Sequence, residues 1–211
     1  RTSLLGVWLL AGILPGCASV DPVLARAKSN ESKQRAKALE QLEKWVIRAR
    51  SGKPRYAPVQ AKIDVFLKQR LTDEPSAFLR AQIIFLALQG EFSSVPLMLM
   101  EGARDGEAHV RLAAVKGMRE FAFEGRKSLL FDLLKNDSDL FVRIEVTKTI
   151  AKVGSEDWAE PLVDVLLDVT QKQNLRDQAY LAARSLTDSQ LPNLDEPWRQ
   201  WLQERRKGAT P

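Results

Sequence analysis

The side chains that most often carry out chemistry at neutral pH are almost absent from this chain. It has one histidine, His109, and one cysteine, Cys17. A zinc or haem site needs more ligands than these, and a hydrolase triad needs a base. His109 stands at an expected helix start, where an exposed or capping histidine is ordinary. The paired carboxylates 156–157 and 195–196 also suit helix N-termini. No glycine-rich phosphate loop is present. We therefore expect no catalytic residue, no metal and no cofactor.

Cys17 follows a short apolar leader. Residues 4–14 are apolar, a length too short to span a bilayer, and the sequence LPGC follows directly. This arrangement resembles the bacterial lipobox, although Pro15 stands where Ala or Ser is usual. The resemblance implies a diacylglyceryl group on Cys17, cleavage before it, and a place on the periplasmic face of the bacterial envelope. Ala18 favours the outer membrane. The alternatives are an uncleaved anchor over residues 4–20 or a buried N-terminal helix.

Charge is unevenly distributed along the chain, whose 45% hydrophobic and 28% charged residues exclude disorder. Residues 17–71 contain 13 Lys and Arg against 5 Asp and Glu, whereas residues 72–170 contain 11 against 17. Basic residues beside a lipid anchor are attracted to anionic headgroups, each by about 1 kcal/mol near the surface. The alternative is a solvated helix face with a loop. The predicted basic patch consists of Lys33, Arg35, Lys37, Arg48, Arg50, Lys53 and Arg55.

A period of about 32 residues runs through the rest of the chain. An apolar residue followed by arginine recurs with spacings of 31, 32 and 33, and core-sized residues follow that arginine at +3 and +7, on one helical face. These segments predict the first helix of each repeat. Pro96, Ser128 and Pro161 repeat with spacings of 32 and 33 and predict the start of each second helix. The recurring arginines are Arg80, Arg111, Arg143 and Arg176.

This pattern resembles the HEAT repeat, in the short bacterial form also called the PBS-lyase HEAT-like repeat. The best-matching stretch begins AHVRLAAVKGM, and the resemblance covers about residues 73–187 and, more weakly, 31–71. It implies an all-α fold, a short α-solenoid of four to five helix pairs with a C-terminal helical cap. Stacked pairs share one continuous core, which a single pair cannot form.

Acidic residues recur with the same period as the arginines. Each Arg can pair with a neighbouring Asp and fix the stacking of one repeat on the next, which is the internal ladder that the resemblance implies. The alternative is a line of arginines that binds phosphates or acidic peptides. The predicted ladder acids are Asp73, Asp105, Asp137 and Asp168.

The chain divides into five segments. We predict a signal peptide over 1–16, a lipidated cysteine with a linker over 17–30, HEAT-like repeats over 31–190, a cap over 191–204 and a tail over 205–211. In the cap, Trp198, Trp201 and Leu202 can cover the last repeat. The alternative for these tryptophans is an aromatic ligand site.

The function that follows is a non-catalytic scaffold, anchored to the membrane by diacylglyceryl-Cys17, whose concave face binds another protein. This inference rests on the fold-level resemblance. The acidic middle of the chain favours a basic partner. The alternative is a nucleic-acid-binding or lyase/chaperone-type protein with an uncleaved anchor, but predicted export argues against both, and we expect no nucleic acid. Candidate partner-binding residues on the second helices are Met98, Glu101, Asp132, Lys135 and Asp164.

Overall fold

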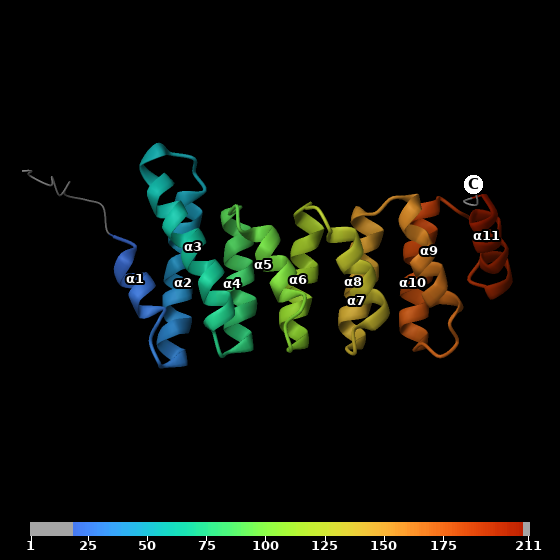
Figure 1. The fold of residues 1–211 in the computed structure, drawn as a ribbon, viewed down its shortest axis with the longest axis horizontal. Coiled ribbons are helices and arrows are strands. Elements are labelled where there is room, and N and C mark those ends of the chain that lie inside the picture. The colour runs from blue at the N-terminus through green and yellow to red at the C-terminus, as the bar shows by residue number, and fades with distance from the viewer. Residues whose placement is uncertain (1–18, 209–211) are drawn as a thin grey trace, which may run out of the picture.

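The computed structural model describes residues 19–208, which form helices joined by short loops without any strand (Figure 1). The predicted signal peptide and Cys17 lie outside the described residues. The elements are α1 (Asp21–Arg26), α2 (Ser32–Ala49), the 3-10 helix η1 (Pro54–Tyr56), α3 (Ala57–Asp73), α4 (Ala77–Gly90), α5 (Val95–Gly102), α6 (Ala108–Glu120), α7 (Arg126–Asn136), α8 (Leu140–Val153), the 3-10 helix η2 (Glu156–Trp158), α9 (Ala159–Leu167), α10 (Gln173–Thr187) and α11 (Asp195–Gly208).

The helices from α2 to α11 form stacked pairs in a single row (Figure 1). The first helices α2, α4, α6, α8 and α10 contact one another in that order and form one layer. The second helices α3, α5, α7, α9 and α11 form the other layer, in which α3 contacts α5 and α9 contacts α11. The predicted all-α short solenoid is therefore confirmed, with a C-terminal helix covering its last repeat.

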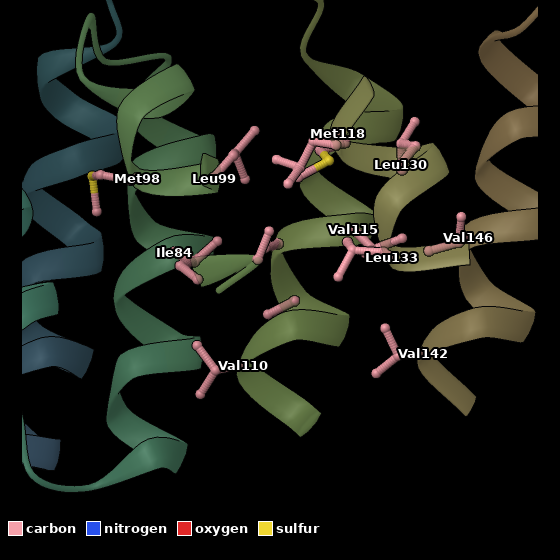
Figure 2. Packing of buried hydrophobic residues seen from close by; sticks show 14 of the residues in the cluster. Ile84, Met98, Leu99, Val110, Val115, Met118, Leu130, Leu133, Val142 and Val146 are labelled. Atoms are coloured by element: carbon pink, nitrogen blue, oxygen red, sulfur yellow. The ribbon is translucent and has the colours of Figure 1, made fainter. Parts of the chain in front are cut away.

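The core lies between the two layers, where the sequence predicts it. Every residue at +3 and +7 after a recurring arginine is buried. Figure 2 shows Val110 and Met118 on α6, and Val142 and Val146 on α8, among these packed side chains. The buried +3 and +7 residues are Ile83, Ala87, Ala114, Met118, Val146, Ile150, Ala179 and Ala183.

One glycine allows α6 to pack closely against the preceding pair. A Cβ atom placed on Gly117 would lie 2.5 Å from Leu99 of α5 and 2.9 Å from Leu88 of α4. Both distances are shorter than any ordinary carbon–carbon contact. A side chain at position 117 would therefore push the helices apart.

The first pair is longer than the others. Helices α2 and α3 have 18 and 17 residues, whereas α6 has 13. The spacing from Arg35 to Arg80 is 45 residues, longer than the later spacings, and most of the additional residues are helical. The connection itself is a short turn followed by η1.

Both ends of the solenoid differ from the predicted boundaries. Helix α1 packs on α2, and its flanking residues Val20 and Ala27 are buried, so residues 20–27 are part of the fold and not a linker. Helix α11 covers the last repeat through Trp198, whose ring is fully buried and whose Nε1 donates to the carbonyl of Pro192 at 3.0 Å. This burial excludes an open ligand site at Trp198. Because α11 continues to Gly208, the tail predicted from residue 205 is wrong up to that point.

Candidate protein-binding surface

Arginines near the start of the first helices tie each repeat to the next one. Arg80 donates from Nε and Nη2 to Asp105 at 2.6 and 2.8 Å, and Arg111 donates in the same way to Asp137 at 2.7 and 2.8 Å. Each Nη1 also donates to two carbonyl oxygens of the loop before its own helix. Bidentate pairs of this kind fix orientation as well as distance. These two arginines are therefore occupied inside the fold and do not present a phosphate-binding line.

The first rung of the ladder uses a different acid from the predicted one. Arg35 donates from Nε and Nη2 to Glu74, both at 2.9 Å, and Asp73 is exposed beside it. Arg70 also donates to Glu74, at 2.7 Å. Arg35 is 5% exposed, so its assignment to the basic patch is wrong. The sequence signal was available, since Arg35 has the +3 and +7 core residues of a ladder arginine.

The last two rungs also differ from the predicted ladder. Arg143 donates to the Oε1 of Gln171 at 2.7 Å, and Gln171 in turn donates to Asp168 at 2.6 Å. The Asp168 carboxylate is therefore linked to Arg143 only through the side-chain amide of Gln171. Arg176 donates to Asp195 of α11 at 3.0 Å. The predicted carboxylate pair 195–196 thus contributes to the ladder.

The ladder sets the protonation of its acids. Burial raises the pKa of the Glu74 carboxyl, but hydrogen bonds from Arg35, the Ser76 N–H and Arg70 outweigh burial and hold that pKa below its ordinary value. For Asp105, burial likewise raises the pKa, and the bonds from Arg80 and from the backbone of residue 107 lower it further than burial raises it. Both carboxylates are therefore charged at neutral pH, as the arginines require.

The second helices leave two grooves open between neighbouring repeats. The groove between α3 and α5 has a volume of about 710 Å³ and is lined by Leu97, Met100 and Glu101, with Lys68 and Arg104 at its edges. The other groove, of about 380 Å³, lies between α7 and α9. Its walls include Phe131, Lys135, Val165 and Asp164. We call these the α3–α5 groove and the α7–α9 groove.

Four of the five predicted partner-binding residues are exposed on the second helices. Glu101 lies in the α3–α5 groove, Lys135 and Asp164 lie in the α7–α9 groove, and Asp132 is exposed on α7, where it accepts from Asn136. The prediction for Met98 is wrong. It is 1% exposed, because α5 begins at Val95 and buries positions 95, 98, 99 and 102.

Several acids of the middle repeats pair with arginines, although most acids of residues 72–170 are exposed. Asp105 and Asp137 belong to the ladder. Acids near the start of α9 and along it pair with α11, from which Arg205 reaches Glu156 at 2.6 Å and Arg206 reaches Asp164 at 2.9 Å. These arginines fall in the segment predicted to be a tail. The sequence does contain a signal for these contacts. Acids recur every four residues at positions 156, 160 and 164, so all three lie on the side that faces α11.

The family model for HEAT repeats matches residues 96–184. No match was found among curated proteins. The matched segment runs from α5 into α10, and the Arg–acid ladder continues the same register on both sides of it, from Arg35 to Asp195. Together with the stacked pairs, this match identifies the described fold as a short HEAT-type solenoid. HEAT repeats generally mediate protein–protein interactions.

The basic residues of the N-terminal helix pair are dispersed over several surfaces. Lys33 and Lys37 are exposed on α2, and Lys53 is exposed in the turn that follows α2. Arg50 forms an exposed ion pair with Glu91 of the next repeat. The remaining two, Arg48 and Arg55, line one pocket and lie over aromatic rings.

His109 is exposed at the start of α6. No group of three or more His, Cys, Asp or Glu side chains within residues 19–208 could hold a metal ion. In the same range, no helix has the length and apolar character needed to cross a bilayer.

Proposed function

We propose that this chain is a lipid-anchored scaffold of the bacterial envelope, in which a diacylglyceryl group on Cys17 holds the repeats at the periplasmic face of a membrane. In this proposal the second helices bind another protein and the chain catalyses no reaction. The HEAT match supports the scaffold role. The apolar leader ending in LPGC supports the anchor.

The observation that carries the scaffold role is the α3–α5 groove. Leu97 is 49% exposed at its wall, although the next two residues of the same helix, Met98 and Leu99, are buried in the core. Lys68 and Arg104 line the same groove and form no ion pair with any residue from 19 to 208. Exposed apolar side chains rimmed by unpaired charges are typical of protein-binding surfaces.

The charges of this face favour a partner of mixed character. Lys68, Arg104 and Lys135 alternate with Glu101 and Asp132 along the second helices. A nucleic-acid interface needs a continuous basic stripe to neutralise phosphates, which this alternation does not provide. Arg35 of the first rung and Arg205 and Arg206 of α11 pair with acids of residues 72–170, the segment that favoured a basic partner. We therefore propose an apolar, mixed-charge protein segment as the occupant of the groove.

A site-specific photocrosslinker tests the binding face. Placed at Leu97 and at Lys135, it is expected to capture the same protein in intact cells, and Lys148 on the first-helix face serves as the control position. The substitution Leu97→Glu should abolish capture from position 135. The matched change Phe141→Glu, at an apolar residue exposed on α8, should leave it intact. Equal capture from position 148, or capture unaffected by Leu97→Glu, would refute this surface.

Fatty-acid labelling tests the anchor independently. Wild-type chain is expected to incorporate the label and to sediment with membranes, whereas a Cys17→Ser variant should do neither. Separation of inner and outer membranes then tests the preference that Ala18 suggests. Labelling that persists in the Cys17→Ser variant would eliminate this anchor while leaving the binding face untouched.

A further inference from the structure

A pocket of about 350 Å³ opens at the N-terminal end of the solenoid, between the start of α1, the second half of α2, η1 and the start of α3. Its apolar walls include Trp45, Tyr56 and Val59. Its basic side chains are Arg48, Arg55 and Lys62. None of these six residues takes part in the Arg–acid ladder, so the stacking of the repeats does not explain why they gather here.

Two of the three cations lack a carboxylate. The Arg48 guanidinium lies 5.5 Å from the centroid of the Trp45 ring, and that of Arg55 lies 4.9 Å from the Tyr56 ring. Neither forms an ion pair with a residue in the range 19–208, whereas Lys62 pairs with Asp21 at 2.8 Å. A guanidinium lying over an aromatic ring keeps its N–H edge free, and this edge matches the oxygens of a phosphate. The pocket therefore carries uncompensated positive charge in a geometry suited to an anion.

A second, apolar groove adjoins this pocket and indicates which chemistry the rest of the ligand has. It runs between α1 and α3, has a volume of about 690 Å³, and shares Asp21, Pro58 and Lys62 with the pocket. Leu24 and Val65 line it, and Val65 is 69% exposed. A phosphate site that opens into an apolar groove fits an amphiphile better than a free phosphate ion, which has no use for the groove.

The position of the pocket in the chain agrees with such a ligand. Ser19 and Val20 form part of its wall, and Cys17 is two residues before Ser19. Two extended residues span at most about 7 Å. A lipid on Cys17 would thus hold the pocket close to the headgroup layer; this step rests on the anchor proposed above.

We propose that this pocket binds an anionic phospholipid, with Arg48 and Arg55 holding the phosphate of its headgroup and one acyl chain lying along the groove between α1 and α3. The bound lipid fixes how the solenoid stands on the membrane, which attachment at the single point Cys17 does not. The second-helix grooves then face a constant direction relative to the bilayer.

Titration calorimetry with soluble lipids tests the pocket without any acylation. The sample is the full chain with Cys17→Ser, and the ligand is dihexanoyl phosphatidylglycerol below its micelle concentration. We expect saturable binding. Dihexanoyl phosphatidylcholine, which has no net charge, and inorganic phosphate, which has no acyl chain, should each bind at least about tenfold more weakly, or about 1.4 kcal/mol.

Two double variants with the same loss of charge separate the pocket from diffuse attraction. Arg48→Gln with Arg55→Gln should weaken phosphatidylglycerol binding at least about tenfold. Lys33→Gln with Lys37→Gln, also on the basic N-terminal pair but outside the pocket, should leave the affinity within about twofold. Because all four side chains are exposed, we expect unchanged thermal unfolding by circular dichroism, which verifies that the variants are folded.

Three results would overturn the proposal. Equal weakening by the two double variants would mean attraction to the overall charge. Equal affinity for phosphatidylcholine or for inorganic phosphate would exclude an anionic lipid as the ligand. Absence of saturable binding would remove the site altogether. None of these results bears on the anchor, because Cys17 is replaced in every sample and its acylation is measured separately.

Discussion

Replacing Glu74 by Gln removes the charge at the most buried rung of the ladder. The Glu74 side chain is 1% exposed and that of its partner Arg35 is 6% exposed. The carboxylate accepts from Arg35, from Arg70 and from the N–H of Ser76. Gln keeps the shape of the side chain, but its amide NH₂ is itself a donor. It cannot accept the hydrogen bonds that the Glu74 carboxylate accepts at that position. The variant therefore leaves two guanidinium groups uncompensated between the first and second repeats.

The expected cost is large for a single substitution. At about 4 Å and an effective dielectric constant of about 20, each arginine attracts the carboxylate by about 4 kcal/mol, although desolvation of the charges offsets much of this. Removing one partner of a buried pair costs about 3–5 kcal/mol, because the remaining charge is left in a poorly solvated site. Since Gln can still accept one hydrogen bond, we expect Glu74→Gln to lower the free energy of unfolding by about 3 kcal/mol.

Urea unfolding followed by circular dichroism measures this loss. The matched control is Glu120→Gln, which breaks the ion pair with Lys152 at side-chain exposures of 65% and 57%. An exposed pair contributes only about 0–1 kcal/mol. The slope with denaturant must also be compared, because repeat arrays can lose cooperativity. If both variants lose the same small amount, the ladder does not fix the stacking and our argument from burial is wrong.

The dependence on pH gives a second, independent readout of the same contact. The pKa of Glu74 is lower in the folded chain than its ordinary value of 4.5. Its contribution is therefore fully present above pH 4.5 and is lost as the pH falls through the lower folded pKa. We expect the stability difference between wild type and Glu74→Gln to be constant near neutral pH and to shrink below about pH 4.5. A difference that stays constant to pH 3 would contradict this assignment.

Three further substitutions test the packing. Gly117→Ala should cost about 1–3 kcal/mol in urea unfolding, because the new Cβ would lie 2.5 Å from Leu99; Gly106→Ala, with no atom within 4 Å, should cost less than about 0.5 kcal/mol, and equal losses would refute the close approach. Trp198→Ala should cost about 3–5 kcal/mol and expose the C-terminal helix to amide exchange, whereas a loss below 1 kcal/mol would mean that the cap is dispensable. Met98→Ala should cost about 2–5 kcal/mol by thermal unfolding; an unchanged melting temperature would return this side chain to the binding face.

The fold was predictable because three requirements recur together in most of the repeats. An amphipathic first helix, a second helix and an Arg–acid rung all follow one period near 32, so each observation reinforces the others. The acid that completes each rung is harder to predict from the sequence. Glu74 replaces the expected Asp73, and its carboxylate lies one position further along the chain with one more methylene, so the contact is preserved while the pattern is broken.

The binding surface was less predictable because exposure depends on the phase of short helices. Helix α5 has only eight residues, and a shift in its expected start changes which of Met98 and Leu97 faces solvent. Contacts between distant segments are not periodic at all. The pairing of Arg206 with Asp164, and the meeting of Arg48 with Arg55 in one pocket, require the stacked structure.

The amide-mediated rung at Arg143 has a mechanical consequence. The other rungs join one repeat to the next through charged pairs, whereas this one joins α8 to the loop before α10 through the neutral side chain of Gln171. Each of these two bonds has one charged partner, but the rung lacks the direct attraction between opposite charges that the other rungs have. When the solenoid is bent or pulled along its length, we expect this contact to open before the charged rungs do.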